Sequence, residues 1–156
     1  MNKIIKFNEI KDVAAKLKKK SKKIVFTNGC FDIFHAGHAY YLNEAKKLGD
    51  VLIVGINSDE SVKRLKGDKR PIIRQNDRAY LISSLAPVDY VIIFEEDTPY
   101  NLIKEIKPDL LVKGSDYKHK DIVGKDIVES NGGKVALIDY LGGRSTSGII
   151  EKIKKL

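Results

Sequence analysis

Short apolar runs rich in β-branched residues recur along this chain and alternate with longer segments of helical period. The runs occupy residues 24–27, 51–56, 90–94, 110–112 and 135–138, and each predicts a buried strand. Helices are predicted at residues 8–20, 37–48, 75–86, 98–106 and 121–130, with a last helix that begins near residue 145. Alternating strands and helices with short connections form right-handed crossovers. The sequence therefore predicts a doubly wound α/β fold with a parallel sheet.

The length of the chain predicts one compact domain. It has 156 residues, close to the commonest size of a single domain. It contains no run of about 18 apolar residues and no apolar stretch typical of a signal peptide. The single cysteine, Cys30, cannot form an internal disulfide, which agrees with a reducing compartment. We therefore expect a cytoplasmic protein that does not enter a membrane.

The positive charge of the chain is concentrated at its N-terminus. Residues 1–23 hold nine lysines against Glu9 and Asp12, so they carry +7 of the net charge of +8. Phe7 is the only aromatic residue there that could stack on a base. We expect a basic helix with a solvated face over residues 1–22, a separate domain over residues 23–156, and no nucleic-acid partner.

Chemistry-bearing residues follow the first predicted strand. The segment reads Thr27-Asn28-Gly29-Cys30-Phe31-Asp32-Ile33-Phe34-His35-Ala36-Gly37-His38, and a predicted helix comes next. In open parallel sheets ligands bind beyond the carboxyl ends of the strands, and the start of a helix offers free N–H groups to phosphate. His35 and His38 are spaced to point the same way in a first helical turn. Two imidazoles placed so could stabilise charge on a transferring phosphoryl group.

Other interpretations of the histidines and the cysteine remain open from the residues alone. Two histidines near a helix start can be a cap and a surface residue. They could also ligate zinc, but His119 is the only further histidine and no cysteine cluster completes a tetrahedral site. Cys30 could act as a nucleophile, although a free cysteine beside a strand is usually a small buried apolar residue.

Two motifs together resemble a known superfamily. The segment Gly29–His38 is similar to the G-x-F-D and H-x-G-H signature of the cytidylyltransferase-like nucleotidyltransferases, and Gly142–Ile150 resembles their Ser/Thr cluster at the start of the last helix. The resemblance implies a Rossmann-like fold, with His35, His38 and Lys113 as catalytic residues and no protein metal site. Mg²⁺ would arrive with ATP. The implied nucleotide-binding residues are Thr27, Asn28, Gly29, Phe31, Gly37, Arg78, Gly114, Ser145, Thr146 and Ser147.

Within that superfamily the longest match is to adenylyltransferases of the ADP-heptose pathway. It runs from about Lys23 to the C-terminus and includes residues 57–59, 65–67, 70–71, 94–99 and 108–117. It implies transfer of AMP from ATP to D-glycero-β-D-manno-heptose 1-phosphate, giving pyrophosphate and ADP-heptose, a lipopolysaccharide precursor. In many relatives a ribokinase-type sugar kinase precedes this domain, so we expect a separate kinase upstream and residues 1–22 as a linker remnant. A homodimer is expected from the uncovered sheet edge.

The acceptor is expected to contact Asp32, Lys66, Arg70 and Asp116. Lys113 ends a predicted strand at the binding edge, where its charge could neutralise phosphate. Asp32 could orient Lys113, bind the sugar or only satisfy local N–H groups. The expected mechanism is direct displacement, which needs no covalent intermediate.

Two rival functions remain. One is a CTP-dependent cytidylyltransferase acting on glycerol 3-phosphate or a related phosphate, although Ala86 stands where the glycerol-phosphate enzymes carry an arginine. The other is a non-catalytic nucleotide- or RNA-binding module. The intact H-x-G-H and Ser/Thr motifs argue against that second rival.

Overall fold

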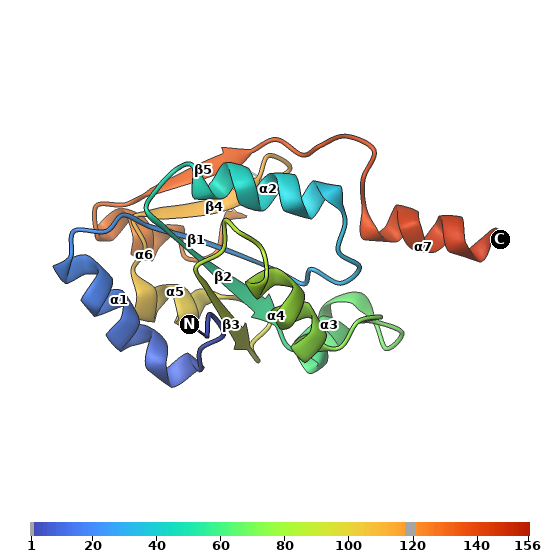
Figure 1. Ribbon diagram of the computed structural model, residues 1–156, viewed down its shortest axis with the longest axis horizontal. Coiled ribbons are helices and arrows are strands. Elements are labelled where there is room, and N and C mark those ends of the chain that lie inside the picture. Colours follow the sequence, from blue (N-terminus) through green and yellow to red (C-terminus); the bar gives the residue numbers. More distant parts are fainter. Residues whose placement is uncertain (1, 118–120) are drawn as a thin grey trace.

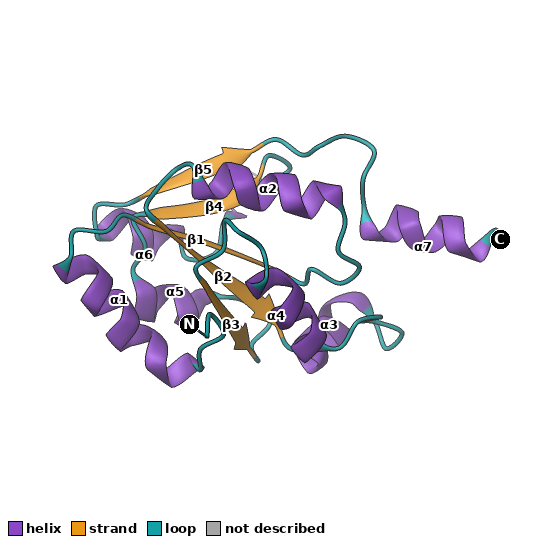
Figure 2. Cartoon of the chain, in the orientation of Figure 1, coloured by secondary structure: helices purple, strands orange, loops and turns teal. Residues whose placement is uncertain are grey.

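A computed structural model describes residues 2–117 and 121–156 of the chain, and its centre is a five-stranded parallel sheet (Figures 1 and 2). The strands are β1 (Ile24–Gly29), β2 (Val51–Asn57), β3 (Tyr90–Phe94), β4 (Leu110–Gly114) and β5 (Lys134–Ile138). Their order in the sheet is β3-β2-β1-β4-β5. The order reverses between β1 and β4, as in Rossmann-like folds. The predicted doubly wound α/β fold is therefore confirmed.

Seven α-helices and one short 3-10 helix lie before, between and after the strands within the described residues. The 3-10 helix is Phe7–Glu9, and the α-helices are α1 (Ile10–Lys19), α2 (Ala36–Lys46), α3 (Asp59–Lys66), α4 (Gln75–Ser83), α5 (Tyr100–Ile106), α6 (Lys125–Ser130) and α7 (Thr146–Lys154). Every predicted helix is present, usually shorter by a few residues. None of these helices is both long and apolar enough to span a membrane.

Helix α3 was not predicted, although its boundaries carry ordinary signals. The Ser58 side chain accepts a hydrogen bond from the Ser61 N–H and so caps the first turn. Asp59 and Glu60 lie in that first turn, where acidic residues favour the helix dipole. Gly67 follows the last turn with a φ of 97°, which a glycine adopts without strain. The segment is short and strongly charged, and Val62 and Leu65 are its only apolar residues, so it does not stand out as a helix in the sequence.

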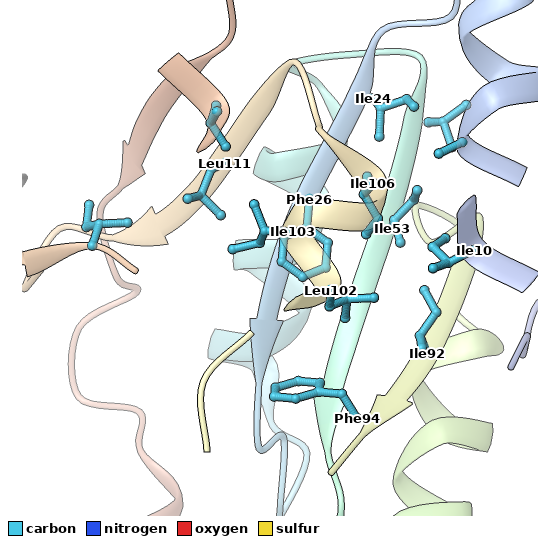
Figure 3. Packing of buried hydrophobic residues seen from close by; sticks show 14 residues of the cluster. Ile10, Ile24, Phe26, Ile53, Ile92, Phe94, Leu102, Ile103, Ile106 and Leu111 are labelled. Carbon is cyan, nitrogen blue, oxygen red and sulfur yellow. The ribbon is translucent and has the colours of Figure 1, made fainter. Parts of the chain in front are cut away.

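The sheet separates two hydrophobic cores. Side chains from α1, α5 and α6 cover one face, where Phe26, Ile53 and Leu102 are fully buried or nearly so (Figure 3). Helices α2 and α4 cover the other face, where Leu42 and Ile82 pack against the strands. Burial of each large apolar side chain contributes about 1.5–3 kcal/mol. These layers fix the strand ends relative to one another, and the strand ends carry the site.

The first and last helices differ in how they join the sheet. Ile10 and Ala14 of α1 belong to the first core, while lysines occupy its exposed positions and its last turn. Helix α7 buries none of its residues and extends away from the body of the domain (Figure 1). Its N-terminal end is nevertheless part of the cavity described next.

Candidate active site

A cavity of about 650 Å³ opens at the carboxyl edge of the sheet. Its walls come from the ends of β1, β2 and β4 and from the N-terminal ends of α2 and α7. It brings together most of the residues that the sequence predicted: Asn28, Gly29, Phe31, Asp32, His35, Gly37, His38, Lys66, Arg70, Lys113, Gly114, Ser145, Thr146 and Ser147. Its position is where the strand order reverses, which is the usual ligand site of such sheets.

His35 is the N-cap of helix α2 and folds back over its first turn. Its Nδ1 accepts a hydrogen bond from the Gly37 N–H at 3.1 Å, so the proton of the neutral ring lies on Nε2. A Cβ on Gly37 would stand 2.9 Å from two atoms of the His35 ring. Glycine is therefore required for this arrangement. This cap leaves Nε2 of His35 available for the expected contact with phosphate, because the two contacts use different nitrogens.

His38 stacks on His35, with 3.8 Å between the ring centroids and 22° between the planes. The side chains of Phe31 and Phe34 enclose its ring. Burial, aided by the neighbouring His35, lowers the pKa of His38 to about 4. The ring is thus neutral at physiological pH and has one N–H to donate. Its Nδ1 is buried without a hydrogen-bond partner among the residues that the structure describes.

Lys113 lies at the end of β4 with only 6% of its surface exposed. Its ammonium group donates to the side-chain oxygen of Asn28 and lies 5.4 Å from the ring centroid of Tyr117. Burial lowers the pKa of Lys113 to about 8. No carboxylate pairs with this ammonium group among the described residues. It is therefore suited to an incoming anion.

The start of α7 forms a second polar wall of the cavity. Ser145 is the N-cap, and its Oγ accepts a hydrogen bond from the Gly148 N–H at 3.0 Å. The Thr146 hydroxyl donates to the carbonyl of Ile33 at 3.3 Å, which joins this helix start to the turn after β1. The first N–H groups of a helix attract anions.

Asp32 and Arg70 form an ion pair at the other side of the cavity. The Arg70 Nε donates to the Asp32 carboxylate at 2.5 Å, and this carboxylate is only 1% exposed. It therefore engages Arg70 and not Lys113.

Three of the predicted residues do not line the cavity. Thr27 is buried, and its hydroxyl bonds to the Tyr41 hydroxyl and to the carbonyl of Val112. Asp116 is exposed outside the lining. Arg78 was expected to face the nucleotide, but it is fully buried.

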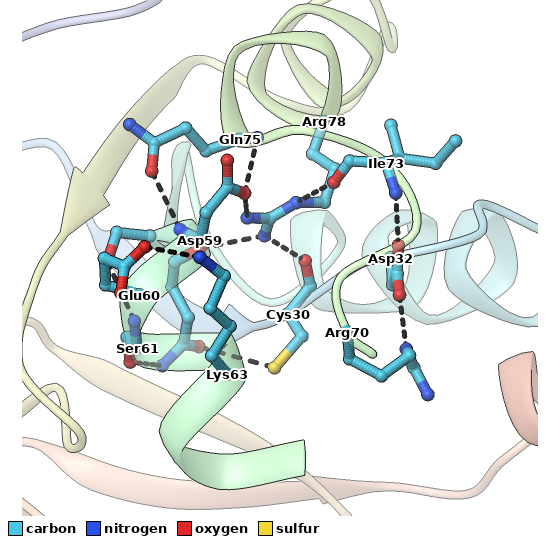
Figure 4. Close-up of polar contacts among 12 residues, drawn as sticks. Cys30, Asp32, Asp59, Glu60, Ser61, Lys63, Arg70, Ile73, Gln75 and Arg78 are labelled. Atoms are coloured by element: carbon cyan, nitrogen blue, oxygen red, sulfur yellow. Dashed lines mark hydrogen bonds and ion pairs between the residues drawn. The ribbon is translucent and has the colours of Figure 1, made fainter. Parts of the chain in front are cut away.

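The guanidinium group of Arg78 is satisfied within the protein. It donates to the carbonyls of Ile73, Cys30 and Asn57 and to the Asp59 carboxylate (Figure 4). It thereby joins the turn after β1 to the end of β2 and to the start of α3. Arg78 supports the cavity wall from behind.

Cys30 lines the cavity, but its chemistry does not suit a nucleophile. Burial raises the pKa of the Cys30 thiol, which keeps it protonated. Its sulfur lies 3.9 Å from the side-chain oxygen of Asn57, and an amide oxygen is no general base.

A zinc site receives no support from the described residues, since they contain no group of three or more His, Cys, Asp or Glu side chains placed to hold a metal ion. His119, the third histidine considered for such a site, lies outside the described residues.

Sequence reasoning missed several lining residues, among them Asn57, Tyr140 and Arg144. Tyr140 lies so close to Gly114 that a Cβ there would stand 2.0 Å from its hydroxyl oxygen. Asn57 and Tyr140 could have been found, because each comes at or just after the carboxyl end of a strand.

Comparisons with known proteins agree with this geometry. The sequence profile of a family described as cytidylyltransferase-like matches residues 26–139. "Bifunctional protein HldE" of a Nitratiruptor species is 62% identical over 148 residues, 95% of this chain and 31% of that protein. The protein of that name from Helicobacter pylori (strain J99) is 58% identical over 89% of this chain and 29% of its own length. The chain thus spans about 30% of the length of these curated relatives.

Two solved structures are also similar. The lipopolysaccharide core biosynthesis protein of Thermoplasma volcanium GSS1 has a TM-score of 0.63 and 37% identity, over 76% of this chain and 96% of its own. Pantoate-beta-alanine ligase of Francisella tularensis, complexed with beta-gamma ATP and beta-alanine, also has a TM-score of 0.63, over 98% of this chain and 78% of its own. Its identity is 18%, so it shows likeness of fold only.

Proposed function

Because the chain belongs to the cytidylyltransferase-like family, we propose that it transfers AMP from ATP to a sugar 1-phosphate, D-glycero-β-D-manno-heptose 1-phosphate, and releases pyrophosphate. The observation that carries this proposal is that one cavity holds the stacked histidines, Lys113 and the Ser145–Ser147 helix start. The heptose acceptor is supported by the resemblance of residues 94–99 and 108–117 to heptose adenylyltransferases. The similarity to a lipopolysaccharide core biosynthesis protein points in the same direction.

The reaction is a direct displacement at phosphorus. An oxygen of the sugar phosphate attacks the α-phosphorus of ATP, the bond from that phosphorus to the bridging oxygen breaks, and pyrophosphate leaves with the bond electrons. The attacking oxygen is already ionised near neutral pH, so no general base is required. Positioning and charge stabilisation then supply the rate enhancement.

Each wall of the cavity has a part in this displacement. The Nε2–H groups of His35 and His38 donate to the oxygens around the α-phosphorus, where charge moves during transfer. Lys113 neutralises the same region with its ammonium group. The N–H groups and hydroxyls of residues 145–147 hold the departing pyrophosphate. The neutral state of His38 suits this role, because a neutral ring donates without a competing counter-ion.

Mg²⁺ is proposed to accompany ATP. Three carboxylates line the cavity: Asp32 is engaged by Arg70, Asp97 is paired with Arg64, and Asp121 is exposed at its edge. With no metal-binding cluster among the described residues, this donor set fits an ion held mainly by phosphate oxygens and water. Such an ion would supply charge neutralisation on the phosphates.

The setting of the reaction is also proposed. Among residues 2–117 and 121–156, those that line the cavity run from Asn28 to Ser147, which agrees with a catalytic domain over residues 23–156 and an accessory role for residues 1–22. We place the reaction in the cytoplasm, with the acceptor supplied by a sugar kinase, and we propose a homodimer. Nucleic acid and membranes have no part in this function.

A pyrophosphate-release assay tests the function. Four nucleoside triphosphates are each combined with heptose 1-phosphate, glycerol 3-phosphate and ethanolamine phosphate, and kcat/KM is measured for each pair. ATP with heptose 1-phosphate should exceed every other pair by orders of magnitude, because polar groups arranged for the sugar hydroxyls stay unpaired with a smaller acceptor. A preference for CTP with glycerol 3-phosphate would overturn the acceptor assignment. Salt-dependent RNA binding without pyrophosphate release would instead indicate a binding module.

A further inference from the structure

The carboxylate of Asp32 is the anchor of a loop that lies far from it in the sequence. It accepts hydrogen bonds from the Ile73 N–H at 2.8 Å and from the Arg70 Nε at 2.5 Å (Figure 4). The Ile72 N–H donates to the same carboxylate at 2.9 Å. Asp32 itself belongs to the turn after β1. This side chain therefore ties the segment between α3 and α4 to the turn that carries the histidines.

The charge of Asp32 is maintained in spite of its burial. Burial alone would raise the pKa of this carboxyl group, but the N–H groups of Ile73 and Ile72 and the Arg70 side chain together hold it below its usual value. The carboxylate is thus ionised wherever the enzyme is folded near neutral pH. Hydrogen bonds to an ionised acceptor are about twice as strong as neutral ones.

The anchored segment has little else to hold it. Ile72 is 53% exposed and packs into neither core. The Arg70 N–H bonds to the carbonyl of Gly67 within the same loop. Beyond Asp32, the segment is tied to the domain interior at its end, by the bond from Arg78 to the carbonyl of Ile73 and by the reciprocal bonds between Asp59 and Gln75. The position of Arg70 therefore depends mainly on Asp32.

The terminal nitrogens of the Arg70 guanidinium group are available to a ligand in the cavity. Its side chain lines the cavity together with Lys66 and is 17% exposed. Its Nε is used by Asp32, while its two terminal nitrogens make no hydrogen bond within residues 2–117 and 121–156. A guanidinium group held on one side and open on the other can bind a phosphate through two N–H groups.

We propose that Asp32 is a positioning residue of the acceptor subsite, which fixes the 70–73 segment so that the terminal nitrogens of Arg70 receive the phosphate of the acceptor. The inference rests on the proposed function and gives Asp32 a role different from direct contact with the sugar. The Asp32 carboxylate faces its three protein donors and is almost fully covered, so the acceptor meets Arg70. The triphosphate end of the cavity, at His35 and Ser145, does not depend on this pair.

The test compares Asp32→Asn, Arg70→Gln and the double variant in the pyrophosphate-release assay. Asp32→Asn should raise the KM of the acceptor about tenfold and leave the KM of ATP within about twofold. In the Arg70→Gln background, Asp32→Asn should add little, because both changes disable the same contact. Additive effects would show that Asp32 contacts the substrate independently and would overturn the proposal. An equal rise in the KM of the acceptor and the KM of ATP in Asp32→Asn would also overturn the proposal.

Asp109→Asn is the matched control. The Asp109 carboxylate also accepts a backbone hydrogen bond, from the Ile24 N–H at 2.7 Å, but it lies at the opposite end of the sheet. The Asp109→Asn variant should lower the melting temperature without a selective rise in the acceptor KM. If Asp32→Asn behaved identically, its role would be structural only, and the proposal would fail.

A second measurement needs no turnover and so separates this inference from the proposed function. Amide hydrogen exchange of Ile72 and Ile73 should accelerate at least about tenfold in Asp32→Asn without substrate, while the amides of β1 stay protected. Inorganic phosphate, titrated with an unreactive ATP analogue present, should bind more weakly to both single variants. If wild-type protein released no pyrophosphate but these two results held, the function would be wrong and the anchoring role of Asp32 right. Unchanged exchange would refute the anchoring role.

Discussion

Lys113 at the end of β4 donates a hydrogen bond to the side chain of Asn28 at the end of β1. The backbone pairing of these strands extends over Val25–Leu110 and Phe26–Leu111, and the side-chain bond lies beyond it. It therefore spans the place where the two strands separate and the cavity begins. A buried ammonium group with a neutral partner is a site prepared for negative charge.

The pKa of Lys113 predicts how activity depends on pH. Because burial lowers it to about 8, the charged form dominates below that pH and is lost above it. We expect kcat/KM for ATP, which reports the free enzyme, to fall up to about tenfold per pH unit above 8. Lys113→Gln should be much slower at neutral pH, and its kcat/KM should not fall above pH 8, because it has no ammonium group to lose its proton. The same decline in the variant would assign it to another group.

Removal of the His38 imidazole should impair chemistry more than folding. We expect His38→Ala to lower kcat by about 10² or more, the usual cost of losing one preorganised donor. Tyr40→Ala changes an exposed residue of the same helix and should leave kcat nearly unchanged. Wild-type turnover in His38→Ala, or loss of its circular dichroism signal, would argue against the catalytic role.

The ring of His38 should stay neutral over the physiological range. Burial lowers its pKa to about 4, so its proton NMR signals should be flat from pH 8 to about pH 5.5 and shift only on further acidification. The spectrum of His38→Ala identifies the signal. A midpoint near the ordinary histidine value would mean that the ring is solvated and not enclosed by Phe31 and Phe34.

Two glycines near the strand ends should respond differently to a methyl group. A Cβ on Gly114 would meet the end of the exposed Tyr140 side chain, which can move. A Cβ on Gly133 would instead lie 2.8 Å from the backbone carbonyl oxygens of Asp109 and Pro108, which cannot move as easily. Gly133→Ala should therefore cost about 1–3 kcal/mol of unfolding free energy and Gly114→Ala much less. Urea denaturation measures both, and the reverse order would contradict the contacts.

The buried Arg78 should be essential for stability. Arg78→Met leaves three carbonyl groups and a carboxylate without their donor, and we expect a loss of about 3–5 kcal/mol in unfolding free energy. Arg64→Met removes an exposed ion pair with Asp97 and should change stability by less than about 0.5 kcal/mol. A stable Arg78→Met with weakened ATP binding would restore the nucleotide-contact interpretation.

The fold could be predicted because each strand contains a short continuous apolar run, as the burial of both faces of a parallel sheet requires. Helix α3 was missed since it is short and highly charged, with Val62 and Leu65 as its only apolar residues. The two phosphate-facing motifs, His35–His38 and Ser145–Ser147, could be located from the sequence. Each begins a helix at the carboxyl edge of the sheet. Asp32 and Arg70 are 38 residues apart, and Arg78 is 48 residues from the Cys30 carbonyl to which it donates. No local pattern in the sequence encodes such pairs, so they become visible only in three dimensions.

Helix α7 has a consequence for the energetics of the whole chain. It buries no residue, and a free helix of its length is marginal in water, yet its first turn forms one wall of the cavity. A triphosphate bound there stabilises the helix by the same free energy with which the ordered helix tightens binding. With the triphosphate bound as proposed, helicity at the C-terminus and nucleotide occupancy should therefore rise together, and the end of the chain should report whether the site is filled.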